Sequence, residues 1–334
     1  MKAVALLSGG LDSTLAARVI LDQGIELVAV NFLTVFCNCT HRGESCLASK
    51  KAVDSLGIPL QVFNVSEEFL DVVKHPKHGY GSNMNPCIDC RIFMLKKAKA
   101  YMEEVEASFL ITGEVLGQRP MSQRRDAMRL IEKESGVEGI LLRPLSAKFF
   151  PATVPEERGW VDREKLLGFS GRSRKPQMRL AEEYGIRDYP CPAGGCLLTD
   201  PAFARRIKDL MIHHPGFTLN DVHLLKMGRH FRLAPQVKLV VGRNEEENQK
   251  IETFSQDGDR LLKVTQHPGP LCLLRGDVRQ EEIGRAASVA VRYSKAKDAG
   301  KVEVRHWRIG EGFNGSVAAS SIPEEALQEW MIGE

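Results

Sequence analysis

A short loop near the start of the chain combines residue types that bind phosphate. It reads Ser8-Gly9-Gly10-Leu11-Asp12-Ser13 and follows an apolar run over residues 2–7. Two glycines allow a sharp bend that brings backbone N–H groups close to a phosphate, and the helical pattern that follows adds its positive N-terminal end. The loop predicts a phosphate-binding site. The alternative is a plain Gly-Gly turn in which Asp12 or Ser13 caps the helix.

The spacing within this loop separates it from the common nucleotide-binding loops. It lacks the Lys-Ser/Thr end of the Walker loop and the third glycine of the dinucleotide fingerprint. Instead, SGGLDS resembles the signature of the PP-loop ATP pyrophosphatases, which cleave ATP between its α- and β-phosphates and adenylate a carbonyl oxygen. The resemblance implies that ATP and Mg²⁺ are bound and that Asp12 is a catalytic residue. The implied ATP-binding residues of the loop are Ser8, Gly9, Gly10, Asp12 and Ser13.

Two separate pairs of cysteines form the second group with chemical potential. Cys87 and Cys90 lie just before a helix expected over residues 91–105, where helix N–H groups and the nearby Lys96 and Lys97 are expected to favour thiolates. Cys191 and Cys196 follow much later, around a Gly-Gly pair. Three or four thiolates can therefore meet. The spacing alone leaves zinc, an iron-sulfur cluster and redox thiols open.

The loop and the cysteines together resemble the tRNA thiouridine synthetases of the PP-loop superfamily, over about residues 1–205. This resemblance implies that Cys90 and Cys196 are catalytic, and that Cys87 joins them as the third ligand of a 4Fe-4S cluster. Cys191 is an extra thiol, and a closed set of four thiolates would instead favour structural zinc. A persulfide or disulfide mechanism without a cluster is the third alternative.

The remaining cysteines have less specific surroundings. Cys37, Cys39 and Cys46 follow the second apolar run, where they can bind metal, handle persulfide sulfur, or be incidental thiols of a loop. Cys272 lies inside an apolar run and is expected to be a small core residue.

A polar segment over residues 112–118 follows the fourth apolar run. In parallel α/β folds, ligands collect where strands end. In the resembling family a Thr-Gly segment at such a strand end lies beside ATP, so Gly113 and Gln118 are expected to contact the nucleotide. A simple loop is the alternative.

Basic residues gather in three stretches of the sequence despite a net charge of only +3. Two of them, over residues 119–129 and 172–179, lie beside the expected nucleotide site, and the third, over residues 292–308, lies near the C-terminal end. Such groups can neutralise the phosphates of RNA, or they can be solvated faces balanced by nearby acids. The expected RNA-binding residues are Arg124, Arg125, Arg172, Arg174, Lys295, Lys297, Lys301 and Arg305.

The elements that must position these residues follow from the apolar pattern. Strands are expected over residues 2–7, 26–32, 60–65 and 109–113, with helices over residues 11–21, 48–56 and 91–105. Their alternation predicts an α/β fold with a parallel-sheet PP-loop ATPase domain over residues 1–143. Prolines divide residues 144–219 into short pieces, which predicts a small, mainly helical unit carrying the distal cysteines. Short β-like runs then predict an α+β module over residues 220–334.

The C-terminal module has a resemblance of its own. The segments 242–248, 267–269, 293–297 and 300–302 resemble the RNA-binding domain of NFACT-type ribosome quality-control proteins, over about residues 222–308. The resemblance implies contact with structured RNA, with tRNA as the expected partner. An auxiliary scaffold domain is the alternative.

Composition sets the class of protein. The 334 residues are 43% hydrophobic and 27% charged, which is typical of globular proteins. No apolar run approaches the ~20 residues of a membrane span, and the first residues do not form a signal peptide. We therefore expect a cytoplasmic protein without membrane contact, with its eight cysteines reduced.

These observations predict ATP-dependent tRNA thiolation by adenylation of a uridine and subsequent sulfur transfer. The sulfur donor is expected to be sulfide or a cysteine desulfurase. One alternative is another PP-loop ligase that resembles the deazaguanine synthases, and another is a non-catalytic tRNA-binding quality-control factor. The sequence leaves open which uridine is modified, whether O2 or O4 is replaced, and the oligomeric state.

Overall fold

The computed structural model describes residues 1–37, 44–189, 196–311 and 315–333. The chain divides into two compact units, Met1–Leu197 and Leu198–Glu334. Residues 144–197 of the expected small helical unit lie in the first and residues 198–219 in the second. The division into three domains remains a prediction.

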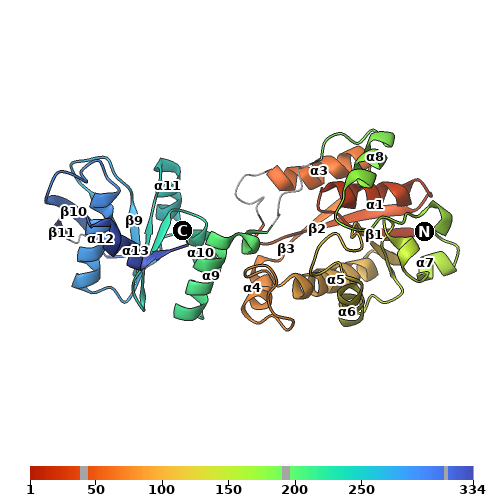
Figure 1. Cartoon of the computed structure of the whole chain (residues 1–334), viewed down its shortest axis with the longest axis horizontal. Coiled ribbons are helices and arrows are strands. Elements are labelled where there is room, and N and C mark those ends of the chain that lie inside the picture. Colours follow the sequence, from red (N-terminus) through yellow and green to blue (C-terminus); the bar gives the residue numbers. More distant parts are fainter. Residues whose placement is uncertain (38–43, 190–195, 312–314, 334) are drawn as a thin grey trace. The chain divides into compact units, whose positions relative to one another are not determined.

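The N-terminal unit is built on a parallel sheet of five strands in the order β3-β2-β1-β4-β5. The helices lie on both of its faces, α1, α3 and α8 on one and α4, α5 and α6 on the other (Figure 1). The strands are β1 (Lys2–Leu6), β2 (Glu26–Leu33), β3 (Leu60–Asn64), β4 (Phe109–Thr112) and β5 (Leu141–Leu142). The helices are α1 (Leu11–Leu21), α3 (Glu44–Leu56), α4 (Ser66–Lys74), α5 (Cys87–Glu104), α6 (Arg125–Ser135), α7 (Val154–Glu157) and α8 (Lys175–Glu183).

Alternation along the strands explains the double covering of this sheet. Ala3 and Ala5 of β1 pack toward the cluster that includes Ile20 of α1, while Val4 packs toward the cluster that includes Leu95 of α5. Strands buried on both faces are typical of parallel sheets. The expected α/β class is thereby confirmed.

The helix carrying the first cysteine pair begins earlier than expected. Cys87 and Cys90 lie in the first turn of α5 and do not precede it, because the chain becomes helical directly after Pro86. The amide of Cys90 donates to the carbonyl of Pro86 at 2.8 Å and so closes this turn. The expectation of a helix starting near Arg91 is wrong by one turn.

The C-terminal unit contains a separate sheet of seven strands in the order β11-β10-β8-β9-β7-β6-β12, with antiparallel pairing throughout the described strands. The strands are β6 (Arg229–Ala234), β7 (Val237–Val241), β8 (Arg260–Val264), β9 (Cys272–Gly276), β10 (Val302–Arg308), β11 (Gly315–Ala319) and β12 (Met331–Ile332). The helices are α9 (Pro201–His213), α10 (Leu219–Leu225), α11 (Glu245–Thr253), α12 (Gln280–Arg292) and α13 (Glu324–Trp330). The expected α+β module is therefore confirmed.

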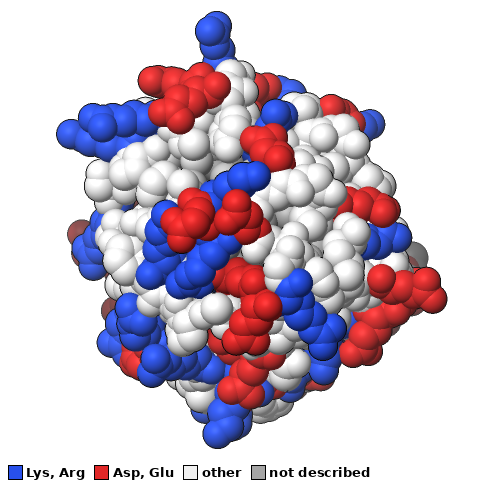
Figure 2. Space-filling view, turned by 90° about the vertical axis from the view of Figure 1, so that its right-hand side faces the viewer, with Lys and Arg blue, Asp and Glu red and all other residues white. Residues whose placement is uncertain are grey.

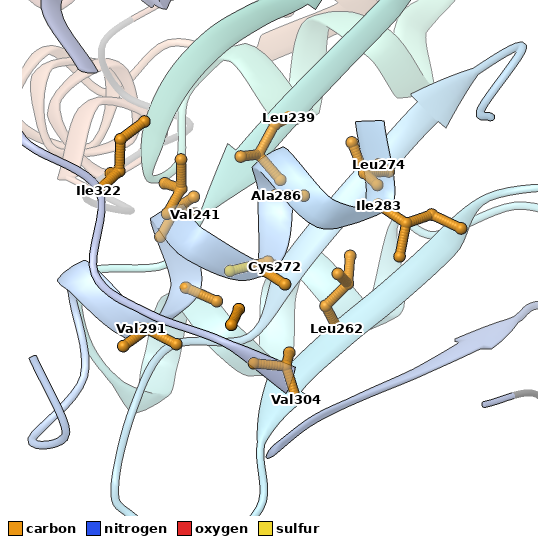
Figure 3. Packing of buried hydrophobic residues seen from close by; sticks show 14 of the residues in the cluster. Leu239, Val241, Leu262, Cys272, Leu274, Ile283, Ala286, Val291, Val304 and Ile322 are labelled. Carbon is orange, nitrogen blue, oxygen red and sulfur yellow. The ribbon is translucent and has the colours of Figure 1, made fainter. Parts of the chain in front are cut away.

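Apolar clusters pack on both faces of this second sheet, and one face also carries basic residues. Helix α12 packs on one face, where Ile283 and Ala286 meet Leu239, Leu274 and Cys272 (Figure 3). Cys272 is 0% exposed, which confirms that it is a core residue. Among the described residues, every helix is too short or too polar to traverse a lipid bilayer.

Candidate functional site

The Ser-Gly-Gly loop joins β1 to α1 in a conformation that depends on its glycines. Gly9 has a φ of +76°, and a Cβ atom on it would lie 2.5 Å from the backbone of Ala48 and Ser49 in α3. Gly10 is the N-cap residue of α1, and no side chain caps this helix. The alternative of a turn capped by Asp12 or Ser13 is therefore wrong. The first-turn N–H groups of α1 remain available for an anion.

The two serines of the loop lie close together. The Oγ atoms of Ser8 and Ser13 are 3.3 Å apart, and Ser13 also donates to the carbonyl of Gly10 at 2.9 Å. Both hydroxyls therefore lie beside the bend, as the phosphate-loop prediction requires.

Gly113 brings the end of strand β4 against the same loop. A Cβ atom on Gly113 would lie 2.4 Å from the amide nitrogen of Ser13 and 2.5 Å from the carbonyl carbon of Asp12. Only glycine permits this approach of two backbones without a shift. The sequence assigned Gly113 to the nucleotide site, and the structure places it directly against the loop.

A chain of side-chain hydrogen bonds fixes the carboxylate of Asp12. Gln118 donates from Nε2 to Asp12 Oδ2 at 2.8 Å, and Gln177 of α8 donates to Gln118 Oε1 at 3.1 Å. Within the described parts of the chain, the other oxygen, Asp12 Oδ1, is buried and accepts no hydrogen bond. A buried oxygen of this kind suits a cation, since Mg²⁺ is commonly bound through one or two carboxylates and substrate phosphates. No sequence pattern pointed to Gln177.

The loop before α8 lies beside this chain of hydrogen bonds. The amide of Gly171 donates to the carbonyl of Leu116 at 2.7 Å, and Ser170 forms a parallel bridge with Leu116. Arg172 is exposed and Arg174 is half-buried. The loop that carries these two predicted RNA-binding arginines therefore lies close to the hydrogen bonds that hold Asp12.

Arg124 and Arg125 make local contacts near the start of α6. Arg124 pairs with Asp126 at 2.8 Å, and Arg125 donates to the carbonyl of Phe149 at 2.7 Å while its guanidinium lies over the ring of Phe150. Both side chains are exposed. Basic and acidic side chains are interspersed on the face of the molecule drawn in Figure 2. The role of these two arginines in binding RNA stays a prediction.

A buried ion-pair network connects the nucleotide edge to the cysteine helix. Glu114, 2% exposed, lies 3.4 Å from Arg91 Nε and accepts from Arg143 Nε at 3.1 Å. Burial alone would raise the pKa of Glu114, but Arg91 and Arg143 hold it below its usual value. Arg143 also pairs with Glu132 of α6. Arg91 directly follows Cys90, so the network ties the end of β4 to the first turn of α5.

The thiols of Cys87 and Cys90 are protonated more firmly than expected. Burial raises the pKa of Cys90 to about 12, Arg91 opposes this rise, and the neighbouring Cys87 and Cys37 thiols add to it. Burial also raises the pKa of Cys87, against the opposing charges of Arg119 and Arg91. Desolvation therefore outweighs the helix N-terminus. The expectation that helix N–H groups with Lys96 and Lys97 favour thiolates is wrong, and Lys97 pairs with Glu68.

Cys37 lies beside Cys196, one of the two predicted catalytic cysteines. These two residues form an antiparallel bridge, and the amide of Leu197 donates to the carbonyl of Phe36 at 2.9 Å. The amide of Thr34 in turn donates to the sulfur of Cys37 at 3.4 Å. The sequence left the role of Cys37 open because a contact between residues so far apart leaves no local pattern.

The cysteines that the structure describes are not arranged as a metal centre. Among the described residues, no three His, Cys, Asp or Glu side chains are placed to hold one metal ion. Cys39, Cys191 and the side chain of Cys46 lie outside the described part of the chain. The assignment of Cys87, Cys90 and Cys196 as cluster ligands therefore stays a prediction.

The predicted RNA-binding residues of the C-terminal unit share high exposure. Lys295 and Lys297 follow α12, Lys301 precedes β10, and Arg305 lies on β10. Arg305 lies opposite Lys263 of β8 in the register, and both are exposed. All four predicted residues are accessible to a polyanion.

The chain combines a parallel α/β unit, whose Ser-Gly-Gly loop lies at the edge of its sheet, with a separate α+β module. The family model of the thiamine biosynthesis protein ThiI matches residues 1–148, and that of the NFACT protein RNA-binding domain matches residues 228–331. The resemblances expected for both parts of the sequence are thereby confirmed. The second match reaches beyond the expected limit at residue 308 and includes α13.

Relatives of known function match the chain in part. The tRNA-specific 2-thiouridylase MnmA of Beutenbergia cavernae is 35% identical over 101 residues, which cover 27% of this chain and 27% of that protein. MnmA of Xanthobacter autotrophicus is 26% identical over 247 residues, covering 69% of this chain and 59% of the relative. The chain thus spans less than two thirds of the length of either relative. A crystal structure of a 4-thiouridine synthetase–RNA complex with bound ATP is also similar, with a TM-score of 0.40, 23% identity, and coverage of 55% of this chain and 41% of that one.

Proposed function

We propose that the protein catalyses ATP-dependent thiolation of a tRNA uridine. One observation carries the proposal: Glu114 joins the strand end beside the Ser-Gly-Gly loop to Arg91, next to Cys90. A phosphate-binding loop and a pair of thiols are thus held at the same edge of one sheet. This is the arrangement needed when ATP activates an oxygen that sulfur then replaces. The matches to tRNA thiouridylases support this choice of substrate.

In the first step, the loop N–H groups and the N-terminus of α1 hold the β- and γ-phosphates of ATP as pyrophosphate leaves. Asp12 Oδ1, buried and without a hydrogen bond among the described residues, would hold Mg²⁺, which supplies charge neutralisation on the phosphates when bound. Gln118 keeps the second oxygen of Asp12 in place. The uracil carbonyl oxygen attacks the α-phosphorus, its new bond replaces the bond to pyrophosphate, and the oxygen becomes part of a leaving group.

In the second step, sulfur replaces this oxygen. A sulfur atom at the sulfide level, held among Cys87, Cys90 and Cys196, attacks the activated ring carbon. AMP then leaves with the former uracil oxygen. No net oxidation occurs if the sulfur arrives as sulfide. A cysteine desulfurase would instead deliver persulfide sulfur, and a thiol of the protein would then supply the two reducing electrons and end in a disulfide.

A 4Fe-4S cluster is the proposed cofactor of the cysteine group, with zinc as the alternative. Soft thiolate ligands suit either. No three of the described residues are placed to hold one metal ion, so the cysteine side chains would have to move together to hold a cluster. The cofactor is decided by metal analysis of the protein.

The C-terminal module is proposed to bind the tRNA. Its match to an RNA-binding domain and the exposure of Lys295, Lys297, Lys301 and Arg305 support this role. Contacts of this kind with phosphates hold the substrate without selecting its sequence.

A single assay tests the proposed function. The full-length protein is incubated with labelled ATP, sulfide and unmodified tRNA, while AMP and thionucleosides are measured. We expect AMP and 2- or 4-thiouridine to form in the wild type and in Asp22→Asn, but not in Asp12→Asn. Asp22 is the matched control because it lies at the opposite end of α1 and pairs with Arg18 at 2.8 Å. AMP without any thionucleoside would instead favour another PP-loop ligase. RNA binding without AMP would favour a non-catalytic factor.

A further inference from the structure

A cavity of about 450 Å³ lies within the C-terminal unit, away from the ATP loop and the cysteines along the sequence. It is bounded by helices α9 and α10, by strands β6, β7 and β9, and by the turn before β8. Pockets of this volume are of the size that binds small molecules or single groups of larger ones. Neither the proposed catalysis nor the exposed basic residues make use of it.

A row of three basic residues forms the inner wall of this cavity. Arg232, Lys238 and Arg275 lie opposite one another on the adjacent strands β6, β7 and β9. Like charges directly opposite one another destabilise a sheet unless they are compensated.

Carboxylates compensate the two outer members of the row. Asp209 accepts from Arg232 Nη2 at 2.6 Å, and Asp259 accepts from Arg275 Nη2 at 2.6 Å. Asp221 also accepts from Arg275 at 2.7 Å. Both guanidinium groups therefore have their partners within the protein.

Lys238, in the middle, lacks an equivalent partner. It is 7% exposed, and its Nζ atom is buried and donates no hydrogen bond to any described residue. The nearest carboxylate, Asp209, is 3.7 Å away and already holds Arg232. A buried ammonium or amine without a hydrogen bond is costly, so a ligand acceptor that reaches it would be bound favourably.

The other walls define the shape and polarity of that ligand. Leu224, Leu225, Val240 and Leu273 give apolar sides. At the mouth, His213 and His214 offer flat rings and Asp257 and Asp277 offer exposed acceptors for N–H groups. The ligand needs a carbonyl at its inner end, a flat apolar body and N–H donors at its edge. A carbonyl-bearing nucleobase has all three.

We propose that this cavity binds one unstacked nucleobase of an RNA, with the base carbonyl accepting from Lys238 Nζ. Proteins recognise RNA sequence mainly at unstacked bases that lie on aromatic or histidine rings and are read along their edges. The inference rests on the proposed binding of RNA by this module. The module would then recognise a base in this cavity, in addition to the phosphate contacts proposed for its exposed basic residues.

The test uses the full-length protein and free uridine, whose dissociation constant is measured by NMR titration. We expect uridine and uridine monophosphate to bind one site with similar affinity. Ribose 5-phosphate should not bind there. Binding of ribose 5-phosphate equal to that of uridine monophosphate would show an anion site and overturn the inference, as would the absence of any uridine binding.

Variants locate the binding in the cavity. Lys238→Met should weaken uridine binding about tenfold or more, as expected for the loss of one hydrogen bond from a charged donor. The matched control Lys208→Met removes an exposed lysine of α9 that does not line the cavity and should bind as the wild type does. Unchanged affinity in Lys238→Met would overturn the inference. If Lys238→Met does not fold, Asp277→Asn at the exposed mouth replaces it, with the same expected weakening.

The uridine measurement is independent of the proposed function. Uridine binding is measured without tRNA, ATP or sulfur donor, so a failed thiolation assay leaves it intact. Conversely, a wild-type protein that thiolates tRNA but does not bind uridine retains its proposed function and lacks this site.

Discussion

The Nε2 atom of Gln118 lies 2.8 Å from Oδ2 of Asp12, although Asp12 lies in the first turn of α1 and Gln118 in the loop that follows β4. This bond holds one carboxylate oxygen and turns the other toward a buried position without a protein donor among the described residues. The carboxylate is therefore oriented before any ligand arrives. Preorganisation of this kind removes an entropic cost from binding and catalysis.

The first prediction concerns this orientation. Gln118→Met keeps the size of the side chain but cannot hold Asp12, so AMP formation should fall about tenfold or more. Melting temperature should change little, because Gln118 is only half-buried. The matched control is Gln61→Met on strand β3, whose exposed amide lies outside the site. Equal rates of AMP formation in the two variants would show that Gln118 does not position Asp12.

A second prediction follows from the contact of Gly113 with α1. Gly113→Ala places a methyl group 2.4 Å from the amide of Ser13, so strand and loop must separate. We expect a loss of about 1–3 kcal/mol in unfolding free energy and loss of AMP formation. Gly216→Ala is the control because nothing lies within 4 Å of its added Cβ atom. Denaturant unfolding and the ATP assay measure both effects, and an active, fully stable Gly113→Ala protein would contradict the close approach.

The third prediction uses the buried Lys238. Burial lowers its pKa from 10.5 to about 7. The unfolded chain therefore binds a proton between pH 7 and pH 10.5 that the folded state releases, and this lysine's contribution makes the protein more stable as pH rises through that range. Lys238→Met should be more stable than the wild type at pH 7, by about 1–3 kcal/mol, and should lose this part of the pH dependence.

Hydrogen exchange of the amides of β6 and β7 at pH 7, 8 and 9, corrected for intrinsic rates, measures this local stability. Lys208→Met is again the control and should follow the wild-type dependence. If the local stability of Lys238→Met changes with pH as it does in the wild type, a titrating group other than Lys238 causes the pH dependence.

The fourth prediction concerns the cofactor proposed at the cysteines. Anaerobically reconstituted protein should show iron-sulfur absorption that is lost in Cys87→Ala, Cys90→Ala and Cys196→Ala and retained in Cys191→Ala. Iron content and visible absorption are measured together. Stoichiometric zinc with no iron would establish the alternative metal.

The fifth prediction concerns the basic residues of the C-terminal unit. Replacement of Lys295, Lys297, Lys301 and Arg305 by alanine should weaken binding of every tRNA tested, since phosphate contacts carry no sequence information. Each lost contact should remove about 0.7–0.9 from the slope of log affinity against log salt. The slow AMP formation in which water replaces the uracil oxygen as nucleophile, measured without tRNA, should be the same as in the wild type. If the slope of log affinity against log salt is unchanged in this variant, RNA phosphates must instead be bound around Arg172 and Arg174.

Long apolar runs made most of the N-terminal sheet predictable. Strands β1 to β4 lie within one residue of their predicted limits. Strands β1, β2 and β4 are largely buried apolar runs, whereas the edge strand β3 consists of exposed and half-buried residues. Strand β5 has two residues, too few to show any period. Helix α6 begins in a basic segment whose charges suggested a binding surface, although its apolar side packs through Met128 and Ile131.

The candidate site was predictable where its residues form a local motif, or where a family resemblance pointed to them, as for Gly113 and Gln118. The loop from Ser8 to Ser13 shows its chemistry through local spacing. The contacts of Gln177 with Gln118 and of Cys37 with Cys196 join segments far apart in the sequence, and no local pattern specifies them. The same holds for Lys238, whose importance follows from what surrounds it and not from its neighbours in sequence.

The order of strands in the N-terminal sheet has a consequence for how the protein is made. Strand β1 is central, and its Ala3 pairs both with Leu27 of β2 and with Phe109 of β4. During synthesis, β1 and β2 leave the ribosome long before β4 exists, so one edge of this central, largely buried strand stays open. We expect nascent chains that end before β4 to need a chaperone, and the ATP loop to acquire its final shape only once Gly113 has emerged.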